Sequence, residues 1–255
     1  MHNLTIDLNA DLGESPERLS DGSDTELMSY ITSANVACGG HAGDASTMET
    51  TLQLARQHNV AIGAHPSYPD RAGFGRSAMN ISAAALEASI AGQLNELIAI
   101  VRRLKMTVAH VKPHGALYHA CNSNSEIAET LGRTVLAIDS GLIVVGQAGA
   151  PCLEIYRQMG LHTAAEAFAD RAYETNGSLR DRKLPGALLE SPQQAAEQAL
   201  AIVTARKVIT VSSSEHSVSA DTLCIHSDTP NAASIGRAVK TRLAAAGVLV
   251  QAFGR

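Results

Sequence analysis

Short apolar runs alternate with amphipathic stretches along nearly the whole chain. Parallel strands covered on both faces by crossover helices produce this pattern. We expect the strands at Thr5–Asp11, Asn35–Cys38, Val60–His65, Val108–Lys112, Leu142–Val145, Thr163–Phe168, Gly186–Leu189 and Leu223–His226. About eight strands over roughly 250 residues favour a closed α/β, TIM-like barrel, with an open doubly wound sheet as the alternative. No linker divides the 255 residues, so residues 1–255 are predicted to form one domain.

The helices between these runs carry clear boundary signals. Residues 82–104 place apolar side chains on one face at helical spacing. The stretch Ser191-Pro192-Gln193-Gln194 is a capping box that predicts a helix ending near Arg206. Gly160 and Gly247 are expected to end two further helices in the left-handed conformation.

Composition excludes several functional classes. The chain has 20 Lys and Arg against 25 Asp and Glu and no basic run, which argues against a nucleic-acid partner. We expect neither secretion nor membrane insertion, because residues 1–7 lack the cationic and apolar regions of a leader and no apolar run approaches the ~18 residues that cross a bilayer. The four cysteines lie far apart, which favours reduced thiols in a cytoplasmic protein without membrane contact.

Polar residues two apart recur on the predicted strands, where they share one face. The sets are Asp7, Asn9 and Asp11; His110, Lys112 and His114; Glu166 and Asp170; and His226 and Asp228. Because the outer strand face of a barrel packs against helices, these side chains should point inward. Ionised groups are costly inside a barrel unless they are paired or used, so the pattern predicts an active site.

Several of these residues have structural alternatives. Asp7 and Asn9 could satisfy buried backbone groups, and Asp44 and Asp228 each precede a helix that they could cap. The glycine-rich stretches Cys38–Gly43 and Gly73–Arg76 fit either tight turns or anion-binding loops.

Three histidines follow directly on predicted strands, where barrel enzymes place catalytic groups: His41, His65 and His114. With Asp11, His41 and His65 make a candidate metal set of the two-histidine, one-carboxylate kind. Neither a serine-hydrolase elbow nor a P-loop motif occurs in the sequence.

Seven segments in order resemble the signatures of the LamB/YcsF family. They are Asp7–Glu14, Ser33–Asp44, Gly63–Arg76, His110–Tyr118, Glu166, Phe168–Tyr173 and Cys224–Pro230. Two positions depart from the expected pattern. Gly40 stands where we expect an aromatic residue, which predicts a looser loop, and Ser227 stands where we expect glycine, which predicts a more restricted backbone.

The resemblance implies a barrel related to the glycoside hydrolase/deacetylase (β/α)7 superfamily. It also implies ATP-dependent opening of 5-oxo-L-proline to L-glutamate, with ADP and phosphate as the other products, by an A subunit that works with subunits B and C. ATP would be a co-substrate that arrives with a divalent cation such as Mg²⁺. Self-association into a homo-oligomer is compatible with the sequence as well.

That chemistry suggests roles for the polar residues. Asp11 or Glu166 would be the general base, Lys112 would stabilise developing negative charge, and His65 or His114 would protonate the leaving nitrogen. Arg76 or Arg171 would hold the substrate carboxylate. The full set expected to bind substrate or phosphate is Asn9, Glu14, Asn35, Asp44, Arg76, Asp170 and Arg171.

Two other functions remain as alternatives: a metal-dependent amide or N-acetyl hydrolase that does not use ATP, and a non-catalytic carrier of a labile intermediate. The segment Arg171–Pro185 is expected to be a mobile lid. Because the chain lacks a P-loop, we expect that it does not complete an ATP-coupled reaction alone.

Overall fold

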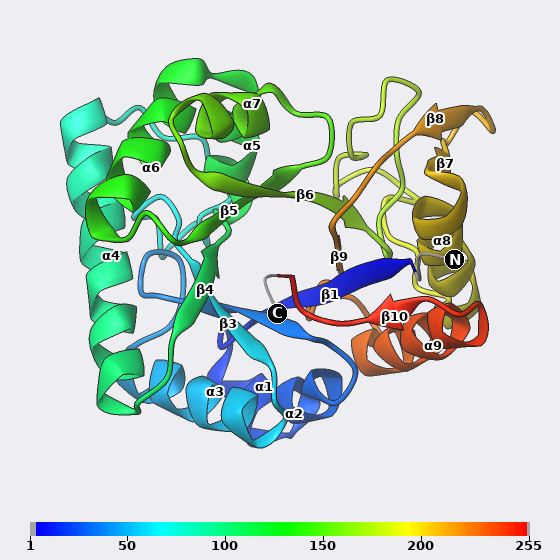
Figure 1. Cartoon of the computed structure of the whole chain (residues 1–255), viewed down its shortest axis with the longest axis horizontal. Helices are drawn as coiled ribbons and strands as arrows, with labels where there is room; N and C mark the ends of the chain where they lie inside the picture. The colour runs from blue at the N-terminus through cyan, green and yellow to red at the C-terminus, as the bar shows by residue number, and fades with distance from the viewer. Residues whose placement is uncertain (1–3, 254–255) are drawn as a thin grey trace.

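The computed structural model describes residues 4–253, and its centre is a closed parallel barrel (Figure 1). The ring order is β1-β2-β3-β4-β5-β6-β9, and a parallel pairing of β9 with β1 closes it. The seven strands are β1 Thr5–Leu12, β2 Ser33–Ala37, β3 Ala61–His65, β4 Val108–Val111, β5 Ile143–Gln147, β6 His162–Phe168 and β9 Thr222–Cys224. The predicted (β/α)7 barrel is therefore confirmed, and the open sheet is excluded.

Helices surround this ring (Figure 1). They are α1 Pro16–Ser20, α2 Ser23–Met28, α3 Ala45–Gln57, α4 Ala83–Arg103, α5 Gly115–Ser123, α6 Ser125–Ile138, α7 Pro151–Gln158, α8 Pro192–Ala205 and α9 Ala232–Ala245. Three short strands lie outside the ring: the antiparallel pair β7 Lys207–Ile209 and β8 Glu215–Ser217, and β10 Leu249–Val250, which pairs with the start of β1.

The helices begin and end where their boundary signals predict. Asp44 caps α3 through a reciprocal capping box with Thr47. At the start of α8 the Ser191 hydroxyl accepts the Gln194 N–H, which is one half of the predicted capping box. Gly160 and Gly247 follow α7 and α9 with φ of 86° and 76°. These contacts are local, so a few neighbouring residues were enough to predict them.

Helix α4 is long and apolar enough, by length and composition alone, to cross a membrane. Its apolar stripe is instead buried in the hydrophobic core, with Leu86, Ile90, Leu94 and Leu97 at most 2% exposed. The helix is thus a barrel helix whose apolar face packs inward.

The prediction of a barrel strand at Gly186–Leu189 is wrong. Leu188 makes only an isolated antiparallel bridge to Arg171, within the long connection between β6 and α8. A parallel neighbour needs a crossover helix, and the first helix after β6 is α8, so the next barrel strand is β9. The pattern also missed β7, β8 and β10, which are too short to show a period.

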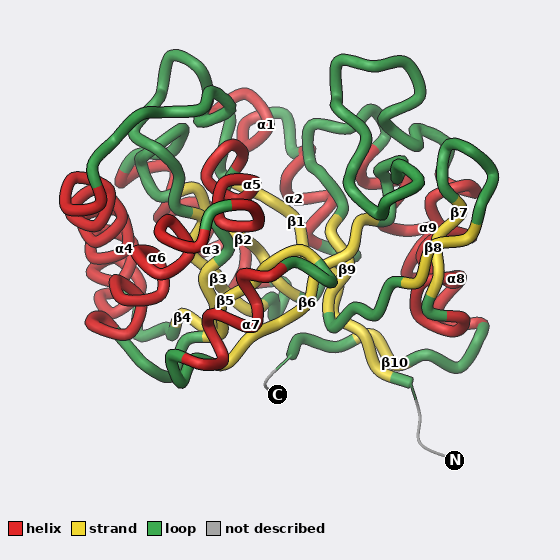
Figure 2. Tube along the Cα trace, turned by 90° about the horizontal axis from the view of Figure 1, so that it is seen from above, coloured by secondary structure: helices red, strands yellow, loops and turns green. Residues whose placement is uncertain are grey.

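Both faces of β1 are buried, with apolar side chains on one and Asp7, Asn9 and Asp11 on the other. The apolar set packs in the hydrophobic core with the helices, which leaves the polar set inside the ring. Figure 2 shows that the long loops gather at one end of the barrel, opposite β10. Residues at the carboxyl ends of the strands therefore face a space bounded by loops, as in other α/β barrels.

Candidate active site at the carboxyl ends of the strands

A cavity of about 590 Å³ opens at this end of the barrel. Most of its acidic and histidine side chains come from strand ends and the residues just after them, and its cations come mainly from the connection after β6. The first group is Asp11, Glu14, His65, His114, His226 and Asp228, with Lys112 among them; the cations are Arg76, Arg171, Arg180, Arg182 and Lys183. His119 from α5 and Asp181 from the connection after β6 complete the ionisable lining. A small anionic ligand would meet positive charge at the rim before it reached the inner side chains.

Lys112 is the central charge of the barrel interior. Its Nζ lies 2.9 Å from Asp11 Oδ1 and 2.8 Å from Glu166 Oε1, and the side chain is almost fully buried. Burial alone would lower the pKa of Lys112, but the two carboxylates hold it well above its usual value. Burial would likewise raise the pKa of Asp11, yet His65 and Lys112 keep it well below the usual value. The charged pair is therefore stable across neutral pH.

Two asparagines hold this pair in position. The Asn9 amide donates to Glu166 Oε1 at 3.0 Å, and the Asn35 amide donates to Asp11 Oδ1 and Asn9 Oδ1, both at 2.8 Å. His110 Nε2 lies 2.7 Å from Asn35 Oδ1, so the imidazole donates to the amide oxygen. Asn9, Asn35 and Glu166 are fully buried behind Lys112 and do not line the cavity.

Asp7 lies deeper in the barrel, where hydroxyl groups surround it. Its carboxylate accepts hydrogen bonds from Thr32 at 2.7 Å, Ser33 at 2.6 Å, and Thr222. Burial raises the pKa of Asp7 to about 6, with the hydroxyls opposing that shift. Within the described part of the chain, the Asp7 carboxylate thus contacts hydroxyl groups and not the backbone groups expected, and Asp7 does not line the cavity.

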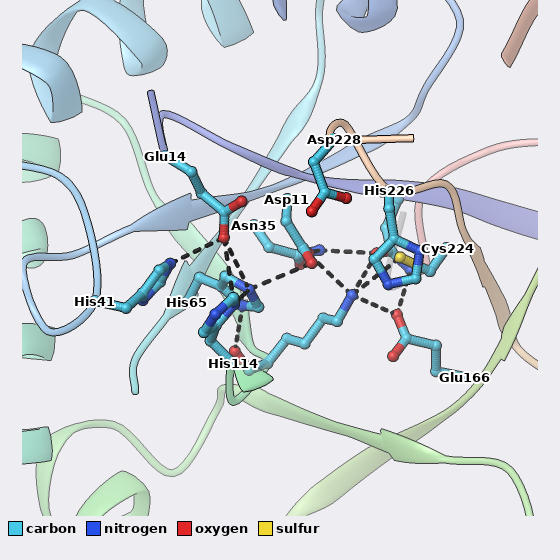
Figure 3. A network of polar contacts seen from close by, with 12 residues as sticks. Asp11, Glu14, Asn35, His41, His65, His114, Glu166, Cys224, His226 and Asp228 are labelled. Atoms are coloured by element: carbon cyan, nitrogen blue, oxygen red, sulfur yellow. Dashed lines mark hydrogen bonds and ion pairs between the residues drawn. The ribbon is translucent and has the colours of Figure 1, made fainter. Parts of the chain in front are cut away.

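A second cluster adjoins the first and consists of Glu14, His41, His65 and His114 (Figure 3). Glu14 Oε1 lies 2.9 Å from His41 Nε2, 3.2 Å from His114 Nδ1 and 3.9 Å from His65 Nε2. His65 Nε2 also lies 3.4 Å from Asp11 Oδ2, which links the two clusters.

The three imidazole rings of this cluster are packed closely together, and two of them are neutral. The rings of His41 and His114 stack with centroids 3.7 Å apart and an interplanar angle of 4°. Burial and the neighbouring imidazoles lower the pKa of both His41 and His114 to about 2. These two rings are therefore neutral at physiological pH.

The Gly73–Arg76 loop supports the histidine cluster. The Phe74 ring meets the rings of His41 and His114 edge-on, and the Phe74 carbonyl accepts a hydrogen bond from His114 Nε2 at 3.0 Å. Gly75 has a φ of 63°, and a Cβ there would lie 2.9 Å from His41 Cβ. The turn alternative for this stretch is thus confirmed, while Arg76 extends from it to the cavity.

Asp170 and Asp228 organise the other side of the site. Asp170, fully buried, accepts from the backbone N–H of His226 at 2.9 Å and from the Thr229 hydroxyl at 2.7 Å. Asp228 bridges Arg76 at 2.6 Å and Arg182 at 2.8 Å. These contacts attach the connection after β6 and the Gly73–Arg76 loop to the residues that follow β9.

Two predicted binding residues are engaged elsewhere. Asp44 is exposed, caps α3 and does not line the cavity. The Arg171 guanidinium lines the cavity but donates to the carbonyl of Arg180 at 2.6 Å.

The predicted metal set was incomplete, because the structure adds Glu14 and His114 to His41 and His65, and pairs Asp11 with Lys112. The sequence feature that could have indicated Glu14 as a metal ligand is its position three residues after Asp11, just beyond the end of the same strand.

Neither departure from the expected motifs disturbs the site. The Gln93 side chain from α4 fills the space beside Gly40, where a Cβ would lie 2.4 Å from Gln93 Oε1, and it hydrogen-bonds the Ser67 backbone. The expectation of a looser loop at Gly40 is therefore wrong. Ser227 is buried and is not among the described residues with positive φ.

Comparisons with known proteins place this arrangement in context. The family model described as LamB/YcsF family matches residues 6–255. A protein from Chloroflexus aggregans, named as the A subunit of 5-oxoprolinase, is 44% identical over 97% of this chain and 98% of its own length. A second protein of the same name, from Pyrococcus furiosus, is 42% identical over 98% of each chain.

Solved structures agree on the fold. A lactam utilization protein from Thermus thermophilus superposes with a TM-score of 0.91 and 41% identity, covering 98% of this chain and 100% of that one. A putative cellobiose-phosphate cleavage protein from Enterococcus faecalis has a TM-score of 0.61 at 12% identity over 97% of each chain, which shows a shared fold alone.

Proposed function

Because this chain belongs to the LamB/YcsF family, we propose that it is the A subunit of an ATP-dependent 5-oxoprolinase that opens 5-oxo-L-proline to L-glutamate. The observation that carries the proposal is the cavity in which the Lys112 ammonium lies against the Asp11 carboxylate beneath an arginine-rich rim. The names of the relatives, which refer to 5-oxoprolinase and to lactam utilization, support the choice of substrate.

The reaction needs activation because the lactam is an unstrained amide with a poor leaving nitrogen. Transfer of the terminal phosphoryl group of ATP to the lactam oxygen releases ADP and makes the ring carbon electrophilic. Water then forms a new C–O bond, the C–N bond breaks, and the nitrogen takes a proton. The resulting acyl phosphate reacts with a second water to give glutamate and phosphate.

The geometry distinguishes between the candidates for each role. Asp11 lines the cavity whereas Glu166 lies behind Lys112, which favours Asp11 as the general base on water. Lys112 is placed to stabilise negative charge on the reacting oxygen or the phosphoryl group. The low pKa of His114 makes it a poor proton donor, and His65 could protonate the leaving nitrogen only while no metal ion is bound to its Nε2.

Of the two arginines, Arg76 is the better candidate to bind the substrate carboxylate. Its side chain is 45% exposed and is paired only through Asp228 among the ion pairs of the described residues. Arg171 already donates to backbone carbonyls that shape the connection after β6. A bidentate guanidinium–carboxylate contact at Arg76 would orient the ring toward Asp11 and Lys112.

ATP handling is assigned to the complex with subunits B and C. The chain has no P-loop lysine followed by Ser or Thr, so a conventional nucleotide cradle is absent from its sequence. ATP would bring Mg²⁺ bound to its phosphates. We therefore propose that this chain supplies the ring-opening site and that its partners couple the site to ATP.

The test is glutamate formation from 5-oxoproline with the chain, subunits B and C, ATP and Mg²⁺, leaving out each component in turn. We expect glutamate only when all components are present. Sustained turnover by the chain alone with ATP, at the rate of the complete mixture, would contradict the assignment of ATP coupling to the partners.

The histidine cluster favours one alternative, an amide or N-acetyl hydrolase that needs a metal ion but no ATP. The same assay distinguishes the two functions, because only the alternative predicts hydrolysis without nucleotide. The substrates for that arm are 5-oxoproline and simple N-acetylated amines, each with the isolated chain and added Zn²⁺.

A further inference from the structure

We propose that Glu14, His41, His65 and His114 form a binding site for one divalent transition-metal ion of the Zn²⁺ class. The four side chains offer one ligand atom each, and these atoms lie within 4.8 Å of one another. The three histidines are at most 6% exposed, and the site adjoins the Asp11–Lys112 pair. The inference concerns metal binding and holds whether or not the lactam reaction is the function.

The backbone determines which nitrogens of two histidines face the cluster. His65 Nδ1 lies 2.7 Å from the Lys112 carbonyl, and His114 Nε2 lies 3.0 Å from the Phe74 carbonyl. A carbonyl only accepts, so both of these nitrogens carry a proton. When each ring carries only that proton, His65 Nε2 and His114 Nδ1 hold lone pairs.

Those lone pairs point at each other and at a carboxylate. His114 Nδ1 lies 3.0 Å from His65 Nε2 and 3.2 Å from Glu14 Oε1. Three electron-rich atoms at this spacing repel one another unless a positive charge lies between them. A metal ion supplies that charge, and metal-bound histidines ordinarily donate their other nitrogen to a carbonyl or carboxylate in this way.

His41 can become the fourth ligand by exchanging its hydrogen bond to Glu14 for a bond to the ion. Its Nε2 lies 2.9 Å from Glu14 Oε1, whereas its buried Nδ1 has no hydrogen-bond partner within the described part of the chain. Moving the proton from Nε2 to Nδ1 frees the Nε2 lone pair for an ion.

The spacing fits a tetrahedral ion. Ligands bound at about 2.0–2.1 Å in a tetrahedron lie roughly 3.3 Å apart. The contacts among Glu14 Oε1, His65 Nε2 and His114 Nδ1 are 3.0, 3.2 and 3.9 Å, which bracket this value. Small side-chain rotations therefore suffice to accept the ion.

The ligand set favours Zn²⁺ or a neighbouring transition metal over Mg²⁺. Imidazole nitrogen suits Zn²⁺, Co²⁺ and Ni²⁺, whereas Mg²⁺ prefers oxygen ligands and retains water. This ion would thus differ from the Mg²⁺ that accompanies ATP. Because Glu14, His65 and His114 line the cavity, a bound ion would lie at the cavity wall, where a cavity ligand would have to join as a fifth ligand or replace one of the four.

The competing explanation is that the cluster shares a proton on one imidazole. To decide, the full chain is stripped with a chelator, dialysed, and titrated with Zn²⁺ at pH 7.5 by calorimetry and with Co²⁺ by visible absorption. We expect one ion per chain, absorption bands typical of low-coordinate Co²⁺, and a raised melting temperature. Nitrogen-15 NMR of the histidines follows the same titration.

The variants Glu14→Gln and His114→Asn should each weaken Zn²⁺ binding by at least about 10-fold. The matched control is His162→Ala, an exposed histidine at the start of β6 that should bind Zn²⁺ as the wild type does. If the variants do not fold, the wild-type NMR titration decides the matter. Histidine signals unchanged by saturating Zn²⁺, or equal binding by folded Glu14→Gln and wild type, would overturn the site.

Discussion

Lys112 Nζ lies 2.8 Å from Glu166 Oε1, a contact that joins the ends of β4 and β6 across the barrel interior. With Asp11 on the other side, the ammonium neutralises one of two buried carboxylates and partly screens the other. Lys112 thus has a structural role that the strand pattern did not reveal, in addition to the chemical role proposed for it.

Lys112→Met should lower turnover at least about 100-fold, because a preorganised charge at the reacting centre is lost. It should also lower the free energy of unfolding by about 3–5 kcal/mol, since Asp11 and Glu166 would be left buried without their partner. Steady-state kinetics of the complete mixture and denaturant unfolding measure the two effects.

The double variant Lys112→Met/Glu166→Gln separates the effect on turnover from the effect on stability. Removing the second carboxylate charge should restore part of the stability while activity stays low. If Lys112→Met alone retains more than half of the wild-type turnover, Lys112 takes no part in the chemistry.

Asp7 should make stability depend on pH. Its pKa rises from 3.8 to about 6 on folding, so the folded state binds the proton more tightly. The resulting stabilisation is present below the unfolded pKa and is lost as the pH rises through about 6. Relative to Asp7→Asn, the wild type should lose about 2 kcal/mol between pH 4 and pH 7. A difference between the two proteins that stays constant over this range would show that the Asp7 pKa is not raised.

Asp228 should hold the predicted lid at Arg171–Pro185 in place. Burial alone would raise the pKa of Asp228, but Arg182, His226 and Arg76 lower it to about 2, so the carboxylate is ionised at neutral pH. Asp228→Asn should speed proteolysis of the segment several-fold, since exposed ion pairs contribute up to about 1 kcal/mol each.

Limited proteolysis with and without 5-oxoproline and the partner subunits checks this behaviour. The control is Glu197→Gln, which breaks the exposed pair with Arg242 far from the segment. Equal cleavage rates with and without ligand and partners would argue against a lid.

Gly75→Ala should disturb the histidine cluster specifically. The new Cβ would lie 2.9 Å from His41 Cβ and 3.0 Å from His114 Cδ2. We expect weaker Zn²⁺ binding in addition to the roughly 1–2 kcal/mol cost of alanine in the left-handed region.

Gly160→Ala is the matched control, because Gly160 has a φ of 86° and no described neighbour within 4 Å of the position that a Cβ would take. It should lose similar stability from the backbone alone and leave Zn²⁺ binding unchanged. Identical Zn²⁺ affinities in both variants would show that the packing of Gly75 on the imidazoles is unimportant.

The amino-acid sequence by itself determined the features that depend on neighbouring residues. The period-two pattern of Asp7, Asn9 and Asp11 placed one polar face on β1, and the Asp44 and Ser191 caps began α3 and α8. Each of these follows from backbone geometry over a few residues.

Only the tertiary structure decided which distant groups meet. Glu14 and His114 are 100 positions apart, and their 3.2 Å contact depends on barrel closure and on the Gly73–Arg76 loop. The Gln93 side chain likewise fills the space at Gly40 from a separate helix. These contacts between distant residues depend on the strand register, the closure of the barrel and the paths of the loops. The pattern of neighbouring residues cannot predict them, because the distance between side chains on different strands is a property of the closed sheet.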